Sequence, residues 1–322
     1  MKSWTPHGRH LSLPVICAPM FIVSGPELVI AQCVAGVVGS LPALNARTID
    51  VLDEWLTRIG NALADHDQDH PDRPAAPYAV NLIVHKSNGL LDEQLAACIK
   101  HEVPIVITSL GARPEVNDAV RGYGGIVLHD VVNLVHARKA IDKGASGLIA
   151  VAAGAGGHAG TLSPFALVQE IREWWDGPLL LSGAIATGSA VLAAQVMGAD
   201  MAYCGSCFIT AREANAVADY KRMVIDGNAG DIVYTDKVSG THSNFLRQSL
   251  ERAGITLDGD RPKRDYGSLM ASAKAWRDIW SAGQGIGIMK EEEPVAAIVD
   301  RMRTQYLAAG RRAGPMASTY DD

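Results

Sequence analysis

The chain has 322 residues, of which 48% are hydrophobic and 20% are charged, and its formal net charge is -6 at pH 7. This length and composition suit a substantial core, in one large α/β domain or two ordinary ones, and exclude a disordered chain. The negative charge and the scattered basic residues disfavour binding to nucleic acid or to anionic membrane surfaces.

The N-terminal residues show no apolar core with a small-residue cleavage site, so no secretory signal is expected. The apolar stretch at residues 15–44 is interrupted by Pro19, Pro26 and Glu27, which favours strand, helix and strand over a membrane span. Five cysteines without framework spacing argue against a disulfide scaffold. We therefore expect a cytoplasmic protein.

Eight short apolar runs alternate with helix-like segments, which is typical of a parallel sheet covered by helices. Closure of eight such units predicts a (β/α)8 TIM barrel, an α/β fold whose active site lies at the carboxyl ends of the strands. The competing fold is an open doubly wound sheet, but no dinucleotide fingerprint follows the first run. The runs are residues 15–20, 37–41, 78–83, 104–109, 125–129, 147–153, 178–184 and 200–205.

The alternation stops after residue 210. Residues 211–274 are more polar and contain turn-rich stretches at 227–230 and 258–262, so we predict a small, mostly helical inserted domain there. The barrel then comprises residues 1–210 plus 275–322. Helical periodicity returns at 291–309, and the tail from Gly310 is expected to be disordered.

A glycine-rich segment with one histidine, Gly154-Ala155-Gly156-Gly157-His158, follows the sixth run. Glycine lets backbone N–H groups approach an anionic ligand closely, and imidazole is suited to proton transfer near neutral pH. The simpler interpretation is a flexible loop with a surface histidine. The place of this segment at the end of a barrel strand favours a functional role.

Small residues follow the seventh and eighth runs, Ser182-Gly183-Ala184 and Gly205-Ser206. Barrels commonly bind phosphate at these two strand ends, and Ser206 could add a hydroxyl donor. Ordinary turn chemistry explains small residues equally well. The functional hypothesis is a phosphate-bearing cofactor that reaches from these loops to the histidine of the sixth strand.

Three weaker patterns favour structural roles. Residues 66–70 contain histidine and aspartate, but we interpret them as a solvated polar loop. The CxxC formed by Cys204 and Cys207 lies in an expected strand, where the two thiols would not both face one metal. No metal site is therefore expected. His129 and Asp130 end the fifth strand and form either a pair that supports the site or ordinary structural residues.

On these residues the chain resembles the nitronate monooxygenase family, formerly called 2-nitropropane dioxygenases. These are FMN-dependent barrel enzymes related to the FMN-dependent enoyl-ACP reductases, and the resemblance covers nearly the whole chain. The motifs that carry it are Ala18-Pro19-Met20, Val80-Asn81-Leu82, Gly156-Gly157-His158-Ala159-Gly160, Ser182-Gly183-Ala184, Gly205-Ser206-Cys207-Phe208 and Trp280-Ser281-Ala282-Gly283-Gln284.

The resemblance implies an FMN-dependent monooxygenase that oxidises alkyl nitronates with O2 to carbonyl compounds and nitrite, with His158 as the base. It places the following residues in contact with FMN: Pro19, Met20, Asn81, Gly156, Gly157, Ser182, Gly183, Ala184, Gly205 and Ser206. The expected partners are a small-molecule nitronate and O2, with no nucleic acid and no membrane; a homodimer is left open.

Two alternatives stay open at this point. The same FMN motifs serve a reductase that takes hydride from NAD(P)H and passes it to quinones or enoyl thioesters. A catalytically idle flavin- or phosphate-binding barrel is the third hypothesis. Asp130 stands where some relatives have a lysine near the flavin, and residues 151–153 lack the acidic or amide residue of several relatives. These departures leave the substrate open more than the cofactor.

Overall fold

The computed structural model describes residues 4–238, 240–258 and 278–318. Its centre is a sheet of eight parallel strands, each of which overlaps one of the apolar runs predicted from the sequence. The strands are β1 (Val15–Cys17), β2 (Gly39–Pro42), β3 (Tyr78–Ile83), β4 (Ile105–Ser109), β5 (Ile126–Val131), β6 (Gly147–Val151), β8 (Leu179–Ser182) and β9 (Met201–Cys204).

The sheet closes on itself. Its strand order is β1-β9-β8-β6-β5-β4-β3-β2, and a parallel bridge joins Ile16 of β1 to Val38, directly before β2. The N–H of Cys17 donates to the carbonyl of Val38 over 2.8 Å, and the N–H of Val38 donates to Val15 over 3.1 Å. The prediction of a TIM barrel is therefore confirmed.

Both faces of the barrel strands are buried. Along β6, Ile149 and Val151 belong to the cluster inside the barrel, whereas Leu148 and Ala150 belong to a cluster that packs under the outer helices. Burial on both faces explains why the strands read as continuous apolar runs rather than as alternating ones.

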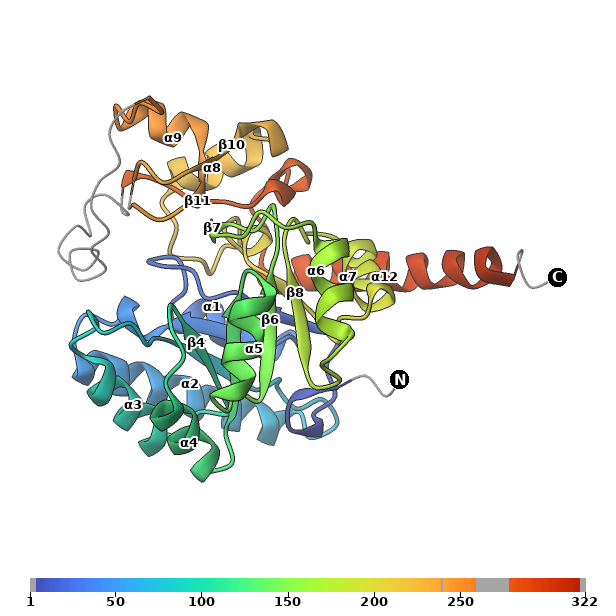
Figure 1. Cartoon of the computed structure of the whole chain (residues 1–322). Coiled ribbons are helices and arrows are strands. Elements are labelled where there is room, and N and C mark those ends of the chain that lie inside the picture. Colours follow the sequence, from blue (N-terminus) through green and yellow to red (C-terminus); the bar gives the residue numbers. More distant parts are fainter. Residues whose placement is uncertain (1–3, 239, 259–277, 319–322) are drawn as a thin grey trace.

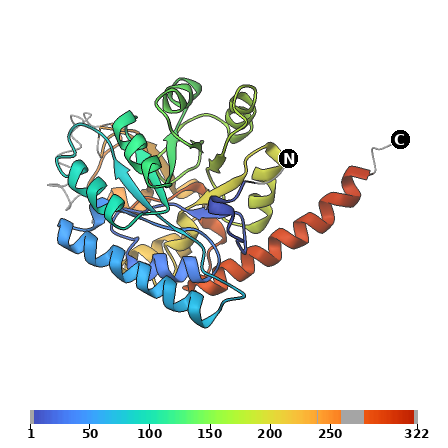
Figure 2. The ribbon, with the colours of Figure 1, turned by 90° about the horizontal axis from the view of Figure 1, so that it is seen from below.

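Helices surround the strands (Figure 2). None in the described residues joins enough length with enough apolar character for a transmembrane span. They are α1 (Pro26–Val34), α2 (Ile49–Asp69), α3 (Leu91–Lys100), α4 (Pro114–Gly122), α5 (Leu134–Asp142), α6 (Pro164–Arg172), α7 (Gly188–Met197) and α12 (Val295–Ser318).

Helix α12 takes the place of the last outer helix, because it packs against α7 and α1. Its C-terminal part extends well beyond the barrel (Figures 1 and 2). The expectation of a disordered tail from Gly310 is wrong as far as Ser318, because helix α12 continues to that residue although Gly310, Gly314 and Pro315 have low helix propensity. Adding residues to an existing helix is easier than starting a new one. Residues 319–322 lie outside the described residues.

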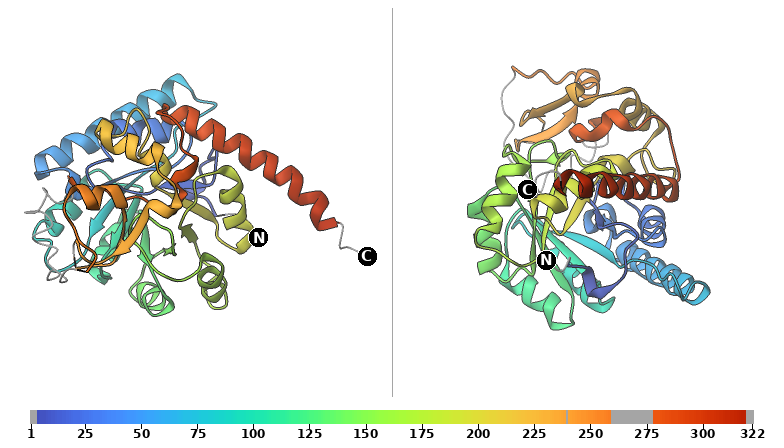
Figure 3. Two further views of the ribbon diagram at one scale, coloured as in Figure 1. Left: turned by 90° about the horizontal axis from the view of Figure 1, so that it is seen from above. Right: turned by 90° about the vertical axis from the view of Figure 1, so that its right-hand side faces the viewer.

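The described residues between β9 and α12 lie over the carboxyl ends of the barrel strands (Figures 1 and 3). It contains α8 (Ala218–Asp226), β10 (Ile232–Thr235), β11 (Ser243–Leu246) and α9 (Arg247–Arg252). The two strands, which the sequence did not predict, pair in antiparallel fashion, and β11 also pairs with the short strand β7 (Gly157–His158). The domain limits stay a prediction. Residues 259–274 of the predicted insert and residues 275–277 after it lie outside the described residues.

Candidate active site

A cavity of about 340 Å³ opens at the carboxyl ends of the barrel strands. A smaller cleft adjoins it and shares Gly156, Ser182 and Ser206 with it, while Gly183 and Ala184 line the cleft alone. The predicted site residues that line the larger cavity are Pro19, Met20, Asn81, Gly156, Gly157, His158, Ser182, Gly205 and Ser206. The residues that the sequence assigned to the cofactor and to catalysis therefore line one or both of these two adjoining cavities.

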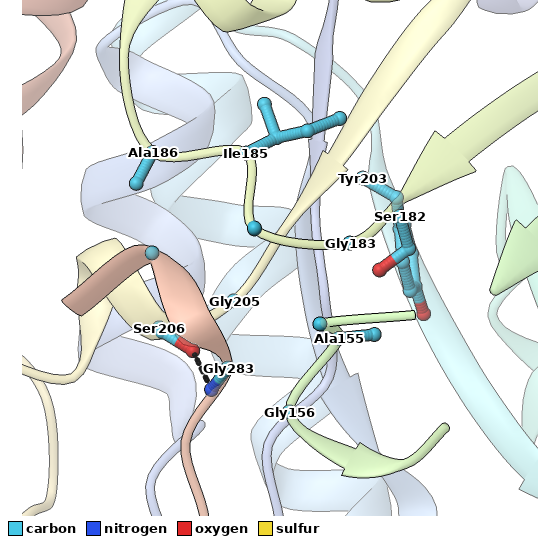
Figure 4. A pocket seen from close by; sticks show the side chains of 13 residues that line it. Ala155, Gly156, Ser182, Gly183, Ile185, Ala186, Tyr203, Gly205, Ser206 and Gly283 are labelled. Atoms are coloured by element: carbon cyan, nitrogen blue, oxygen red, sulfur yellow. Dashed lines mark hydrogen bonds between the residues drawn. The ribbon is translucent and has the colours of Figure 1, made fainter. Parts of the chain in front are cut away.

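The turn after β8 forms one wall of the cleft (Figure 4). Gly183 has a φ of +139°, and a Cβ there would lie 2.7 Å from the carbonyl oxygen of Ala153, so the position requires glycine. The N–H groups of Ile185 and Ala186 make no hydrogen bond within the described residues, and α7 begins directly after them, with Thr187 as its N-cap. Free amides before a helix N-terminus favour an anion.

The opposite wall of the cleft is held by a segment from the far end of the chain. The N–H of Gly283 donates to Oγ of Ser206 over 2.8 Å, which leaves the Ser206 hydroxyl free to donate to a ligand (Figure 4). The carbonyl of Gly154 accepts hydrogen bonds from Ala184 over 3.2 Å and from Gln284 over 2.9 Å. The result is a cradle of backbone and one hydroxyl that suits a phosphate group.

His158 lines the larger cavity from β7, and it pairs with Ser243 of β11. Burial lowers the pKa of the His158 imidazole to about 4, so the ring is neutral near pH 7 and can accept a proton. His158 therefore lies on a short, paired strand. The simpler interpretation of the sequence was a flexible loop.

Side chains on both sides of His158 fix the backbone of its segment. The amide Nδ2 of Asn244 donates to the carbonyl of Ala155 over 2.6 Å, and the hydroxyl of Tyr234 donates to the carbonyl of Ala159 over 3.1 Å. Both Asn244 and Tyr234 belong to the inserted strands, so this segment forms part of the site, which the sequence did not reveal.

A polar relay runs along the wall formed by β3, β4 and β5. Nδ2 of Asn81 donates to Oγ of Ser109 over 2.7 Å, and the Ser109 hydroxyl donates to Oδ2 of Asp130 over 2.6 Å. All three residues line the cavity. Burial raises the pKa of the Asp130 carboxyl to about 6, and the hydrogen bond from Ser109 opposes that rise in part.

The loop that follows β1 is clamped by Asn45. Its Oδ1 accepts from the N–H of Ile22 over 2.9 Å, and its Nδ2 donates to the carbonyls of Met20 over 3.0 Å and Ser24 over 2.7 Å. Ile22 has a φ of +67°, a conformation that a β-branched residue rarely adopts. The loop therefore presents Met20 to the cavity in one strained, fixed conformation.

Aromatic residues from the inserted and C-terminal segments line the cavity as well. Tyr220 of α8 stacks on Trp280 with ring centroids 5.0 Å apart, and the Arg252 guanidinium lies 4.0 Å from the centroid of the Trp280 ring. The Tyr220 hydroxyl also donates to the carbonyl of Ser281. Sequence reasoning noted Trp280 and Ser281 only as part of a motif and missed Tyr220, because no local pattern links them to the strand ends.

Neighbouring residues His129 and Asp130 point to opposite faces of β5. Asp130 lines the cavity. His129 points away from the cavity, and its Nδ1 lies 2.6 Å from Oγ1 of Thr108. Burial lowers the pKa of His129 to about 4. Of the two alternatives for this pair, His129 takes the structural role.

Two details of the weaker patterns are corrected by the structure. Residues 66–69 continue helix α2 instead of forming a loop, and Asp67 there pairs with Arg9 over 3.2 Å. Cys207 lies in the 3-10 turn η3 (Ser206–Phe208) rather than in a strand, so its thiol contacts that of Cys204. In the described residues, no three His, Cys, Asp or Glu side chains are grouped as a metal site would need.

The model of one protein family, described as nitronate monooxygenase, matches residues 7–304 of this chain. A nitronate monooxygenase of Paraburkholderia phytofirmans is 26% identical over 91% of this chain and 92% of its own length. A nitronate monooxygenase of Neurospora crassa is 22% identical over 95% of this chain and 91% of its own.

Solved structures share the fold. FabK from Thermotoga maritima superposes with a TM-score of 0.79 at 21% identity and covers 95% of this chain and 96% of its own. A nitroalkane oxidase from Streptomyces ansochromogenes superposes with a TM-score of 0.78 at 24% identity, with 94% and 97% covered. At such identities the likeness establishes the fold alone.

Proposed function

The chain belongs to the nitronate monooxygenase family, a family of oxidoreductases, and from this premise we propose that it is an FMN-dependent enzyme that oxidises alkyl nitronates with O2 to carbonyl compounds and nitrite. One observation carries the proposal. The backbone cradle at β8 and β9 lines a cleft that adjoins the cavity lined by the neutral imidazole of His158, and Gly205 and Ser206 of the cradle line both.

The residues present fit FMN. A Cβ at Gly183 would meet the Ala153 carbonyl at 2.7 Å, so this cradle is built without side chains, as close approach of a phosphate requires. We assign the phosphate to Gly183, Ala184, Gly205 and Ser206. The remaining contacts to the flavin are assigned to residues that line the larger cavity: Pro19, Met20, Asn81, Gly156, Gly157 and Ser182. When bound, FMN supplies the redox chemistry, accepting electrons from the substrate and passing them to O2.

His158 provides the proton transfer in this proposal. A nitro group acidifies the C–H bond beside it, and a neutral imidazole can accept that proton. The low pKa of His158 keeps the ring neutral over most of the physiological range. A nitronate has already lost this proton, so its oxidation does not need the base.

The rest of the cavity wall favours a small, largely apolar substrate. Phe21, Leu110 and Trp280 line it, and among its described lining residues there is no lysine or arginine. A dinucleotide such as NAD(P)H carries phosphates that basic side chains usually bind. This composition therefore supports the proposed monooxygenase over the reductase alternative.

The deciding experiment is oxygen uptake by the purified protein with ethylnitronate and with neutral nitroethane, in the absence of any nicotinamide, after its visible spectrum is recorded. We expect a bound-flavin spectrum and rapid uptake with nitronate. A yellow protein that consumes no oxygen but oxidises NADH or NADPH with quinones or enoyl thioesters would favour the reductase. A colourless protein that cannot be loaded with FMN would reject both.

A further inference from the structure

We propose that Asp130 acts as a carboxylic acid toward the bound flavin: it donates a hydrogen bond to the flavin ring and holds one of the protons taken up when the flavin is reduced. This inference rests on the proposed function, because it assumes that FMN occupies the cavity. It assigns to this chain a residue that touches the cofactor and sets its proton count.

The strand order places Asp130 on the wall that faces the phosphate cradle. In the ring of eight strands, β3 lies across from β8, β4 lies across from β9, and β5 is next to β4. A flavin anchored at β8 and β9 by its phosphate therefore extends toward Asn81, Ser109 and Asp130.

The hydrogen-bond directions on this wall are fixed by their partners. Asn81 uses Nδ2 to donate to the carbonyl of Ile107 over 3.0 Å and to Oγ of Ser109 over 2.7 Å, so it offers its Oδ1 as an acceptor to a ligand. The hydroxyl of Ser109 donates its only proton to Oδ2 of Asp130. The carboxyl of Asp130 is thus the group of this relay that can still carry a proton toward the cavity.

The polar edge of a flavin ring has one N–H donor flanked by carbonyl and imine acceptors. Asn81 Oδ1 complements the donor, and a protonated Asp130 complements an acceptor. An ionised Asp130 would instead face lone pairs with lone pairs and would repel the negative charge that the ring gains on reduction. Complementarity therefore requires the acid form whenever the reduced flavin is present.

Asp130 is also the group of the described cavity wall that titrates in the neutral range. The other titratable groups on that wall are His158, Tyr203 and Tyr220. Burial keeps all three neutral there, since it lowers the pKa of His158 and raises those of both tyrosines. The pKa of Asp130, about 6, lies between them.

The balanced step above this pKa is as follows. Oxidised flavin and the Asp130 carboxylate take up two electrons and two protons, giving reduced flavin with a proton on N5 and a single negative charge, and Asp130 as the neutral acid. The electrons come from the nitronate in turnover, or from dithionite in a titration. Without a carboxylate at this place, the same reduction takes up one proton.

The test is the midpoint potential of the FMN-loaded protein as a function of pH, read from the flavin spectrum during dithionite titration. At about pH 8, each proton taken up corresponds to a tenfold change per pH unit, or about 30 mV for a two-electron couple. We expect a slope of two protons in the native protein and of one proton in Asp130→Asn. Asp130→Ala serves as a second variant and should also give one proton.

The outcomes separate the two proposals. Equal proton counts in the native protein and in the FMN-loaded variants would overturn the role of Asp130, but they would not contradict the proposed oxidation of nitronates. A native slope of one proton at about pH 8 would overturn it as well. Native protein that binds no FMN would overturn both proposals, whereas a purely structural Asp130 would change flavin retention without changing the proton count.

Discussion

The backbone N–H of Gly157 donates a hydrogen bond of 2.7 Å to Oγ of Ser281, although 124 residues separate the two in the sequence. The Ser281 hydroxyl in turn donates to the carbonyl of Asn244 over 2.8 Å. One side chain therefore joins the segment that carries His158, the inserted strand β11 and the return to the last helix. Its removal should disturb the position of His158, the proposed base, rather than the proposed phosphate cradle.

For Ser281→Ala we expect kcat/KM for nitroethane to fall about tenfold, which corresponds to the loss of about 1.4 kcal/mol from one hydrogen-bonded contact. Oxidation of ethylnitronate, which does not need the base, should change little. Steady-state oxygen uptake on both substrates measures this. Ser281→Thr, which retains a hydroxyl, is the control, and a similar loss on both substrates would show that the bridge supports the whole site.

For His158→Ala we expect FMN to stay bound while turnover of neutral nitroalkanes falls by about 10² to 10⁴-fold, the usual contribution of a general base. Ethylnitronate should still be oxidised. Flavin absorbance and oxygen uptake report the two properties separately. If nitroethane turnover is unchanged, His158 does not act as the base.

The pH dependence of the native enzyme provides a second check on His158. The base must be neutral, and burial lowers its pKa to about 4. Activity on nitroethane should therefore persist as the pH falls from 7 to about 5 and decline only near the pKa of the ring. A decline centred near the ordinary histidine value, about 6.5, that persists in Asp130→Asn would contradict a buried, neutral base.

For Gly205→Glu we expect protein that purifies without flavin, because the carboxylate would face the phosphate across the cradle. A Cβ at this position would lie 3.3 Å from the Cβ of Ala18 and 3.7 Å from Sδ of Met20, so a side chain can be accommodated with small shifts. Gly205→Gln, which has the same size without the charge, is the matched control and should retain more FMN. Equal flavin content in the two variants would place the phosphate elsewhere.

His129 should make the protein sensitive to acid. Its pKa is about 4 when folded and about 6.5 when unfolded, so protons bind the unfolded chain preferentially between these values and stability falls as the pH drops through this range. For His129→Gln we expect the loss of unfolding free energy between pH 7 and about pH 4.5 to be smaller by about 2 to 3 kcal/mol.

Urea unfolding at the two pH values measures this difference. Asp130, whose pKa is raised to about 6, contributes with the opposite sign, because its stabilising acid form is lost as the pH rises. That contribution is the same in both proteins and cancels in the comparison. Identical acid sensitivity of native protein and variant would show that His129 is protonated in the folded state.

The barrel was predictable because most of its strand residues are apolar on both faces, as Leu148 and Ile149 illustrate on β6. The glycine-rich segments were predictable because glycine marks positions that leave no room for a Cβ, as at Gly183. The strand β7 was not predictable. It has two residues, and its partner Ser243 lies 85 positions away in the sequence, so no local pattern announces the pairing.

The wall opposite the cradle shows the same limit. Asn81, Ser109 and Asp130 lie within the last three residues of three successive barrel strands, and each is a polar residue near the carboxyl end of an apolar run. Their relay depends on side-chain directions and on the register of β3, β4 and β5, which the sequence does not specify. The roles of Gly154, Tyr220 and Gly283 depend likewise on contacts between distant segments.

The dependence of the cavity on residues 281–284 also orders its assembly. A chain made from its N-terminus has all eight barrel strands once Cys204 has been synthesised, but Gly283, Gln284 and Ser281 follow about 80 residues later. Contacts of such long sequence separation form late and slowly. During synthesis the chain therefore passes through a stage in which all eight barrel strands have been made, while the segment that contacts Ser206, Gly157 and the Gly154 carbonyl is still missing.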